Sequence, residues 1–469
     1  MFAKSQHIHF VGIGGIGMSG IAEILLTLGY KVSGSDAKRS PVTDRLEQLG
    51  AHVYEGHEAA NVQGAEVLVT SSAIDKQNPE VVAAREQRVP VIQRAEMLAE
   101  LMRLKYGVAI AGMHGKTTTT SMAAAVLAGG GLDPTVVVGG RVNTLGSNAR
   151  LGKSQYLVVE ADESDRSFLK LSPIVAVVTN IDREHMDCYR DMADVENAFV
   201  EFMDRVPFYG LNIACADNDL LRGLLPRVKR RITTYGTHAE SDFLISNVEM
   251  GLRSPEEPNR TFSRFQIKHR TNPLGEFRIY APGWHNVLNA TAAIAVGIAL
   301  EIPADKVRSG LEDFRGVDRR FQMRGEANGV AVVDDYGHHP TEIKATLNAA
   351  RQCGYKRVHV IFQPHRYTRT RDLLQDFSTA FGDADTLGIL DIYAASEKPI
   401  PGVSAEALLK LIAAPKQTAY YPSFADAVGQ MVSLAQPGDM VLTLGAGSVS
   451  QIGPLLLDAL QARAKERSA

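Results

Sequence analysis

The chain has 469 residues, of which 45% are hydrophobic and 22% charged, and its formal net charge is −3 at pH 7. This composition is ordinary for a soluble globular enzyme of about two to four domains, and it does not favour a nucleic-acid coat or a membrane-surface protein. The cysteines Cys188, Cys215 and Cys353 are far apart, so they form neither a metal-binding spacing nor a disulfide framework. We expect a cytoplasmic protein without a targeting segment or a membrane-spanning helix.

The first block, roughly residues 1–106, is predicted to be a small parallel α/β domain, because short apolar strands alternate with helical stretches. The expected strands are residues 7–14, 30–36, 66–73 and 89–95, and the expected helices are residues 42–49 and 79–87. In such folds, ligands bind beyond the carboxyl ends of the strands. We therefore expect functional residues directly after the strands.

The first strand leads into VGIGGIGMSG, in which Gly12, Gly14 and Gly17 have the spacing of a dinucleotide fingerprint. Glycines permit a tight turn and let backbone N–H groups approach a pyrophosphate at a helix N-terminus. Asp36 ends the next strand, where an acid usually meets a ribose hydroxyl. The pattern predicts a pyrophosphate site, but it leaves open a nicotinamide dinucleotide, another nucleotide diphosphate, or a glycine turn without a ligand.

The second block, residues 107–324, begins with the strand, loop and helix of YGVAIAGMHGKTTTTSM. Gly112, Gly115, Lys116 and Thr117 resemble a phosphate loop, with two residues instead of the usual four between the glycines. The shorter form can still bind phosphate, because backbone donors cradle the oxygens, the lysine adds positive charge and the threonine offers a hydroxyl to Mg²⁺. A simple helix cap is the alternative interpretation.

Polar residues also follow the later strands of this block. Glu160 comes after the apolar strand of YLVVEADESD, where a magnesium-binding acid or a solvated acidic turn is expected. His185 follows the strand of IVAVVTNIDREHMD and is either structural or a ligand or base. Asn286 and Asn289 begin a strong predicted helix, where an amide reads an adenine edge or caps the helix. The polar segment 241–280 is expected to form antiparallel strands.

The third block, residues 325–469, again alternates strands and helices. Just before it, Arg320 is a candidate contact for the γ-phosphate of ATP, with a surface charge cluster as the alternative. The segments VDDYGHHPTE and FQPHRYTRTRD each follow a strand and bring polar residues to one rim: Asp335, His338, His339, His365, Arg366 and Arg369. Because arginine binds carboxylates and phosphates with two parallel hydrogen bonds, this density indicates function more than packing.

The combination resembles the Mur ligases, the ATP-dependent amide-forming enzymes of peptidoglycan precursor synthesis. The resemblance covers nearly the whole chain and depends on GMHGKTTTT, EADESD, NIDREHMD, HNVLNA, RRF, DDYGHHPTE and FQPHRYTRT, in the family's order. It implies an α/β fold of three domains: a Rossmann-like UDP-sugar domain (1–106), a P-loop ATPase-like domain (107–324) and a Rossmann-like amino-acid domain (325–469).

The resemblance further implies the reaction and its partners. The enzyme would join L-alanine to the lactyl carboxylate of UDP-N-acetylmuramate through an acyl phosphate, with ATP and Mg²⁺ as cofactors. We expect no nucleic-acid partner, no membrane insertion, and a monomer or homodimer.

Roles for individual residues follow from the same resemblance. It assigns the sugar nucleotide and alanine to Gly12, Gly14, Gly15, Gly17, Asp36, Ser71, His338, Arg366 and Arg369. It assigns ATP to Gly112, Met113, His114, Gly115, Lys116, Thr117, Thr118, Asn286, Asn289, Arg320 and Asp335. It assigns Mg²⁺ to Thr117, Glu160 and His185. The expected catalytic residues are Lys116, His185, His338, Arg366 and Arg369, with His338 or His185 as the base.

One departure concerns a carbamylated lysine that many family members carry after the histidine. This chain has no lysine between Lys170 and Lys229, so a carboxylate such as Glu196 is expected to take its place.

Other functions account for parts of the sequence. A nicotinamide-dependent oxidoreductase explains the first glycine loop and Asp36 but leaves the second loop unused. A P-loop binding or motor protein uses only the second loop, and an inactive scaffold does not need Lys116 or Glu160. Within the family, a recycling ligase adds a whole tripeptide to the same sugar nucleotide. The pair Tyr336-Gly337 and the run PHRYTRT favour addition of a single alanine.

Overall fold

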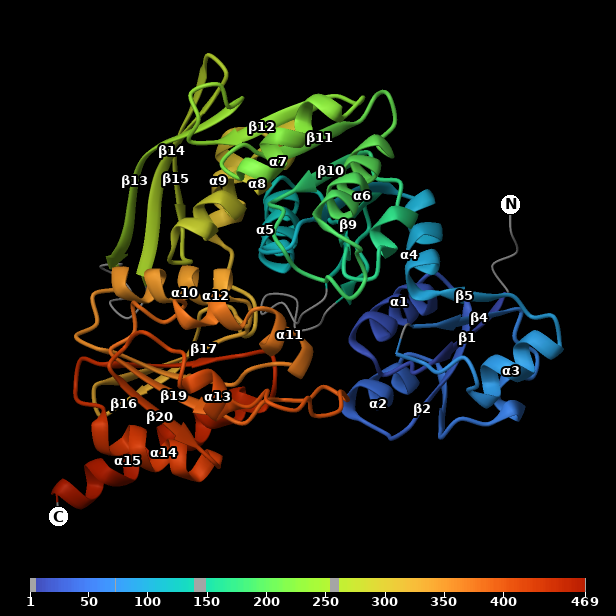
Figure 1. Ribbon diagram of the computed structural model, residues 1–469. Helices are drawn as coiled ribbons and strands as arrows, with labels where there is room; N and C mark the ends of the chain where they lie inside the picture. The colour runs from blue at the N-terminus through green and yellow to red at the C-terminus, as the bar shows by residue number, and fades with distance from the viewer. Residues whose placement is uncertain (1–5, 72, 139–148, 254–260, 469) are drawn as a thin grey trace. The chain divides into compact units, whose positions relative to one another are not determined.

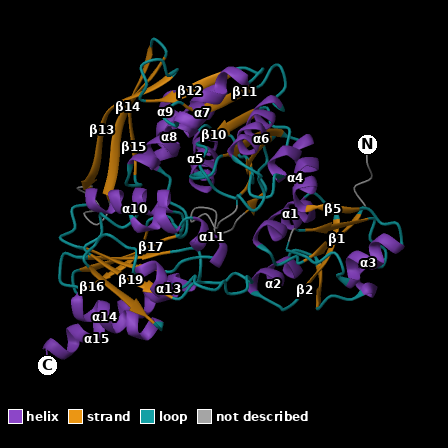
Figure 2. Ribbon diagram, viewed as in Figure 1, coloured by secondary structure: helices purple, strands orange, loops and turns teal. Residues whose placement is uncertain are grey.

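The computed structural model describes residues 6–71, 73–138, 149–253 and 261–468. The described part of the chain contains three β-sheets, each accompanied by helices (Figures 1 and 2), which confirms the predicted α/β class. The chain divides into two compact units. Unit 1 comprises Met1–Ser246, Gln266–Phe277 and Leu288–Arg315, and unit 2 comprises Asn247–Phe265, Arg278–Val287 and Gly316–Ala469. The three predicted domain ranges, 1–106, 107–324 and 325–469, stay a prediction.

The first sheet of unit 1 has five parallel strands in the order β3-β2-β1-β4-β5. Its segment contains β1 (His7–Val11), α1 (Ile16–Thr27), β2 (Lys31–Asp36), α2 (Pro41–Gln48), β3 (His52–Glu55), η1 (Ala59–Val62), β4 (Val67–Thr70), α3 (Pro79–Glu86), β5 (Val91–Gln93) and α4 (Arg94–Arg103). The central β1 is buried throughout. Strand order reverses between β1 and β4, and ligands of open α/β sheets bind at such a reversal. The loop after β1 is the predicted pyrophosphate loop.

The second sheet has ten strands in the order β15-β14-β13-β12-β11-β10-β6-β9-β7-β8. Its segment contains β6 (Tyr106–Ala111), α5 (Lys116–Gly129), β7 (Thr135–Val137), β8 (Ala149–Arg150), β9 (Tyr156–Glu160), η2 (Ser167–Lys170), β10 (Val175–Val178), α6 (Met192–Asp204), β11 (Leu211–Cys215), α7 (Asp219–Leu224), η3 (Leu225–Arg227), β12 (Ile232–Gly236), β13 (Phe243–Arg253), β14 (Thr261–His269), β15 (Asn272–Ile279), α8 (Trp284–Ala299) and α9 (Ala304–Glu312). The parallel neighbours of β6 are β9 and β10, so the segments after these three strands share one edge of the sheet.

The polar segment 241–280 forms β13, β14 and β15, apart from residues 254–260, which lie outside the described residues. Strands β14 and β15 are neighbours in the sheet and are joined by only two residues, Arg270 and Thr271. A connection this short is possible only between antiparallel strands, as the sequence predicted.

Helix α5 is buried along most of its length, because its Thr, Ser and Ala side chains are small enough for close packing. A Cβ on Gly129, the last residue of α5, would lie 2.7 Å from Cα of Gly310 in α9. This close approach holds the helix that follows the phosphate loop in place.

The third sheet belongs to unit 2 and has the order β16-β17-β21-β18-β19-β20. Its segment contains β16 (Gln322–Ala327), β17 (Val330–Asp335), α10 (Pro340–Gln352), β18 (Val358–Phe362), α11 (Tyr367–Asp372), α12 (Leu374–Ser378), β19 (Thr386–Leu390), α13 (Ala405–Leu409), β20 (Gln417–Tyr421), α14 (Phe424–Leu434), β21 (Met440–Leu444), η4 (Ser448–Gln451) and α15 (Ile452–Ser468). Only β16 is antiparallel to its neighbour. Strands β17, β18 and β21 are fully buried, consistent with a sheet covered on both faces.

Within the described residues, no helix combines the length and the apolar character that crossing a membrane requires.

Candidate active site

The phosphate loop between β6 and α5 depends on two glycines with left-handed backbone conformations. Gly112 has φ +129° and Gly115 has φ +82°. A Cβ on Gly112 would lie 2.1 Å from Oγ1 of Thr179, and a Cβ on Gly115 would lie 2.5 Å from Oδ1 of Asn289. Any other residue would meet both an unfavourable φ and a steric clash, so this tight turn requires glycine at both positions.

Residues after β10 hold the loop from one side. The backbone N–H of His114 donates to Oδ1 of Asn180 at 2.9 Å, and its carbonyl accepts from the Thr179 hydroxyl at 2.7 Å and the Asn180 amide at 2.9 Å. Helix α5 then begins without a side-chain cap from Gly115. The uncapped N–H groups and the positive end of the helix dipole make this helix start suitable for an anion.

Lys116 is folded back onto its own loop. Its Nζ donates to the carbonyls of Gly112 at 2.8 Å and Met113 at 3.2 Å, and to Oε1 of Glu163 at 2.7 Å. Burial disfavours the ammonium form, but the carboxylates of Glu163 and Glu160 outweigh this effect and raise the pKa of Lys116. The side chain therefore stays positively charged at neutral pH.

The three predicted magnesium ligands all lie around this loop in unit 1. The Thr117 hydroxyl is 3.1 and 3.0 Å from the two carboxylate oxygens of Glu160. Nε2 of His185 lies 3.4 Å from Oε1 of Glu163. His185 also has φ +59°, an uncommon conformation for this residue type and one that is concentrated at functional sites.

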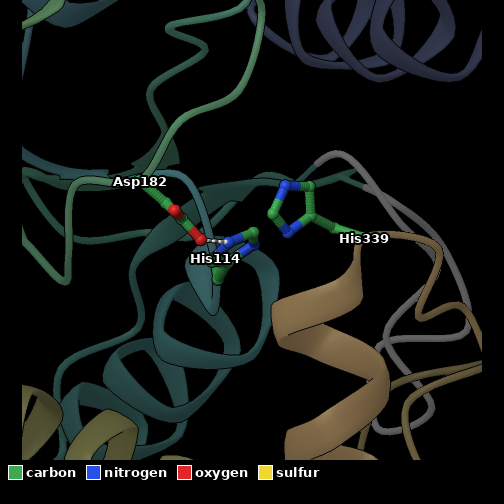
Figure 3. Close-up of side chains that lie close together, drawn as sticks. All are labelled: His114, Asp182 and His339. Atoms are coloured by element: carbon green, nitrogen blue, oxygen red, sulfur yellow. Dashed lines mark hydrogen bonds and ion pairs between the residues drawn. The ribbon is translucent and has the colours of Figure 1, made fainter. Parts of the chain in front are cut away.

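His114 contributes a side-chain contact as well as its backbone. Its Nε2 lies 2.9 Å from Oδ2 of Asp182, and Figure 3 shows the two side chains pointing toward one another. Asp182 follows β10, so the predicted loop and the segment carrying His185 are joined by both backbone and side-chain hydrogen bonds.

The remaining residues predicted to bind ATP have structural contacts of their own. Oδ1 of Asn289, in α8, accepts a 3.1 Å hydrogen bond from Thr119 in α5. In unit 2, the Asn286 amide donates to the Pro282 carbonyl at 2.8 Å. Met113 and Thr118 are buried. The assignment of these residues to ATP stays a prediction.

The glycine-rich loop after β1 is held by β2. The N–H of Gly12 donates to the Ser35 carbonyl at 2.8 Å, and the N–H of Gly14 donates to Oδ2 of Asp36 at 2.9 Å. Helix α1 begins after Gly15 without a side-chain cap, as expected for a pyrophosphate-binding turn. In the structure Asp36 fixes the loop, and its predicted contact with a ribose is not tested.

A cavity of about 500 Å³ adjoins the ends of β4 and β5, and Ser71 is among its lining residues. Arg94, Lys76, Arg85 and Lys170 bring four basic side chains to this cavity. A Cβ on Gly17 would lie 2.5 Å from Nη1 of Arg94, so this arginine also touches the glycine-rich turn. Two acidic residues, Asp75 and Asp165, also line the cavity, so its lining is net basic, which suits an anionic ligand.

The residues of unit 2 gather after β17 and β18. Glu342 connects several of them: its Oε1 accepts from Arg320 at 3.3 Å, and its Oε2 accepts from the backbone N–H of His338 at 3.1 Å. Asp335 is used structurally, because its carboxylate accepts from the N–H groups of Phe321 and Gly337, both at 2.7 Å. Burial raises the pKa of Asp335 despite the opposing charge of Arg320.

The His/Arg group that the sequence predicted is assembled within unit 2. The rings of His338 and His365 are 5.8 Å apart, and Nη1 of Arg369 lies 3.1 Å from Nδ1 of His365. Burial, together with the charges of His338 and Arg369, lowers the pKa of His365 to about 3. Arg366, also close enough to affect that pKa, has φ +71°. The structure therefore brings His338, His365, Arg366 and Arg369 of the predicted group close together, and the function of the group stays a prediction.

The sequence patterns did not single out three residues that the structure places at these sites: Glu163, Glu342 and Arg94. Each is a charged residue in an ordinary helical or acidic context, so no local pattern distinguishes it. Glu196, expected to replace a carbamylated lysine, instead lies 3.4 Å from Arg227. That role of Glu196 stays untested.

Three family models match the chain. The Mur ligase catalytic domain matches residues 7–106, the Mur ligase middle domain matches residues 110–297, and the Mur ligase glutamate ligase domain matches residues 319–447. Together they cover most of the 469 residues, so the chain belongs to the Mur ligase family.

Three individual proteins show how similar the chain is to particular members of the family. A UDP-N-acetylmuramate–L-alanine ligase of Koribacter versatilis is 67% identical over 465 residues, covering 99% of both chains. The solved structure of a UDP-N-acetylmuramate–alanine ligase from Thermotoga maritima matches with a TM-score of 0.80 and 28% identity, covering 97% of this chain and 99% of that one. A murein peptide ligase from Psychrobacter arcticus matches with a TM-score of 0.69 and 25% identity over the same shares.

Proposed function

We propose that the chain joins L-alanine to the lactyl carboxylate of UDP-N-acetylmuramate and converts ATP to ADP and phosphate. The observation that carries the proposal is the 67% identity, over almost the full length of both chains, to a ligase of that name. The intact contacts of Lys116, Thr117 and Glu160 support an active enzyme over an inactive scaffold. The Mur ligase assignment also favours UDP over a nicotinamide dinucleotide at the first loop.

The first step would activate the carboxylate. Oxide is a poor leaving group, so a carboxylate does not condense with an amine in water. Transfer of the γ-phosphoryl group of ATP to the lactyl carboxylate gives an acyl phosphate, whose leaving group is phosphate. In this chain the loop N–H groups and the charged Lys116 would position the triphosphate and stabilise the negative charge of the transition state.

Mg²⁺ fits the donor set next to the phosphate loop. Thr117 and Glu160 supply oxygen atoms at contact distance from one another, and magnesium prefers oxygen ligands. We propose Thr117, Glu160 and His185 as the residues that hold it. When bound, the ion would neutralise charge on the phosphate oxygens.

The second step needs a base for the alanine amine. Nδ1 of His338 lies 3.1 Å from the Tyr336 carbonyl, which can only accept a hydrogen bond. In neutral His338 the proton therefore resides on Nδ1, and Nε2 carries the lone pair that a base requires. We assign the base to His338 and propose that Arg366 and Arg369 bind carboxylate groups of the substrates.

UDP-sugar binding is assigned to the glycine-rich loop and the cavity with its basic lining. All three cysteines are free thiols, in keeping with the cytoplasmic location that we propose.

The test is phosphate release from ATP in the presence of Mg²⁺ and UDP-N-acetylmuramate, with L-alanine or L-Ala-γ-D-Glu-diaminopimelate added in parallel. We expect release with alanine. Release with the tripeptide alone would keep the family but change the amino substrate. Release without the sugar nucleotide would contradict the proposed reaction.

A further inference from the structure

A buried carboxylate lies between two residues that the proposed function uses. Glu163 is 0% exposed, and its Oε1 lies 2.7 Å from Nζ of Lys116 and 3.4 Å from Nε2 of His185. Among the described residues, its Oε2 has no hydrogen-bond partner. A buried carboxylate with one oxygen unsatisfied costs folding free energy, so its presence here is better explained by the site than by stability.

The position of Lys116 depends on Glu163. An ammonium group has three protons, and Lys116 makes three contacts: two with loop carbonyls and one with Glu163. Glu163 supplies the only charged partner among these three. A phosphate bound at the loop would therefore compete with Glu163 for the same ammonium.

The same carboxylate oxygen also faces His185. The 3.4 Å separation is an ion-pair distance, close enough for the carboxylate to orient the imidazole ring. A carboxylate that orients a metal-binding histidine in this way directs its other ring nitrogen toward the metal. The segments of the two residues are also tied together, because the Tyr189 hydroxyl donates to the Glu163 backbone carbonyl at 2.6 Å. Tyr189 itself donates its N–H to the carbonyl of His185 at 3.1 Å.

We propose that Glu163 is a positioning residue that sets both Lys116 for the nucleotide and His185 for Mg²⁺. Nucleotide binding and metal binding would then be coupled through one carboxylate. The inference rests on the proposed function for the roles of Lys116 and His185, but the contacts of Glu163 do not depend on which amino acid is ligated.

The test is Glu163→Gln, which keeps the shape of the side chain and removes its charge. Calorimetric binding of ADP to the full chain at increasing Mg²⁺ should show a midpoint at least tenfold higher than in the wild type. We expect kcat to fall about 10- to 100-fold, the effect usual for a residue that orients a metal ligand, with KM for UDP-N-acetylmuramate within about twofold. Glu163→Asp keeps the negative charge, so its magnesium midpoint should lie between those of Glu163→Gln and the wild type.

Asp194→Asn is the matched control. Asp194 is a buried carboxylate whose two 3.0 Å hydrogen bonds with Arg166 hold the same turn without touching Lys116. The Asp194→Asn substitution should lower the melting temperature without changing the magnesium midpoint for ADP binding. If Glu163→Gln does not fold, Glu163→Asp carries the test and should still show a higher midpoint than the wild type.

A wild-type magnesium midpoint in the folded Glu163 variant would overturn the proposal. So would a pattern that matches Asp194→Asn, with lower stability and no selective effect on the metal. A wild-type chain that binds ADP with Mg²⁺ but does not ligate alanine would contradict the proposed function, while the binding comparison would still decide the role of Glu163.

Discussion

Oδ2 of Asp36 accepts a 2.9 Å hydrogen bond from the backbone N–H of Gly14, linking the end of β2 to the glycine-rich turn after β1. A Cβ on Gly14 would lie 2.9 Å from the same oxygen. The hydrogen bond therefore also depends on residue 14 being a glycine, which has no side chain to crowd the carboxylate. The acid therefore shapes the turn that we propose as the pyrophosphate site, and this structural role does not depend on a contact with a ribose.

Substitutions of Asp36 test whether this hydrogen bond maintains the loop conformation that ligand binding needs. Asp36→Ala removes the acceptor and should weaken binding of UDP-N-acetylmuramate at least about tenfold, because hydrogen bonds to charged groups contribute about 1.5–3 kcal/mol and about 1.4 kcal/mol is a factor of ten. Asp36→Asn keeps an acceptor oxygen and should bind within about threefold of the wild type. Titration calorimetry measures both variants. Wild-type affinity in Asp36→Ala would show that the loop does not need this hydrogen bond.

Lys116 is expected to act on ATP and not on the sugar nucleotide. Lys116→Ala should lower kcat by about 10²-fold or more, the loss typical when a group that stabilises transition-state charge is removed. The dissociation constant for UDP-N-acetylmuramate should stay within about twofold, since that ligand is assigned to the first sheet. The exposed Lys153→Ala is the control for loss of a lysine. If Lys116→Ala lowered kcat and the affinity for UDP-N-acetylmuramate equally, the assigned domain roles would be wrong.

The tight contact between Gly115 and Asn289 predicts a selective defect in nucleotide binding. Gly115→Ala combines φ +82° with a Cβ 2.5 Å from Oδ1 of Asn289, so the loop, the Asn289 side chain or α8 must move. We expect KM for ATP to rise at least tenfold. Gly131→Ala is the matched control, because φ is +78° but no heavy atom lies within 4 Å of its Cβ. It should cost only about 1–2 kcal/mol of stability and leave KM unchanged. The two variants are compared by steady-state kinetics and thermal melting.

The low pKa of His365 predicts a loss of stability in acid. Burial and neighbouring cations lower the pKa of His365 from 6.5 to about 3, so between these values the unfolded chain binds a proton that the folded chain does not. The free energy of unfolding should therefore fall as pH decreases from about 6.5, by at most about 1.4 kcal/mol per pH unit for this group.

His365→Asn removes the titrating group but keeps an acceptor for Arg369. Its stability should depend less steeply on pH between about 6.5 and 4, as measured by urea unfolding at a series of pH values. Some slope should remain, because burial also lowers the pKa of His285 to about 4. An unchanged slope in the variant would show that His365 does not titrate as described.

The sequence by itself determined the features that depend on consecutive residues. Apolar runs followed by glycine, as at Gly12 and Gly112, predicted strand, turn and helix correctly, because backbone conformation there is decided locally. The order of the motifs was sufficient to indicate the Mur ligase family. The short strand β3 has four residues, of which only Val53 is buried, so its pattern was too weak to be predicted.

Only the tertiary structure decided which of these local features meet. The pairing of Glu163 with Lys116 spans 47 positions, and that of Asp36 with Gly14 spans 22. Glu163 stands in the acidic run EADESD, where Glu160 was the better candidate from sequence, and nothing local shows which carboxylate turns inward. That choice depends on the order of β10, β6 and β9 in the sheet, which places the ends of these strands side by side. Strand order results from packing over the whole chain, so local sequence patterns do not contain it.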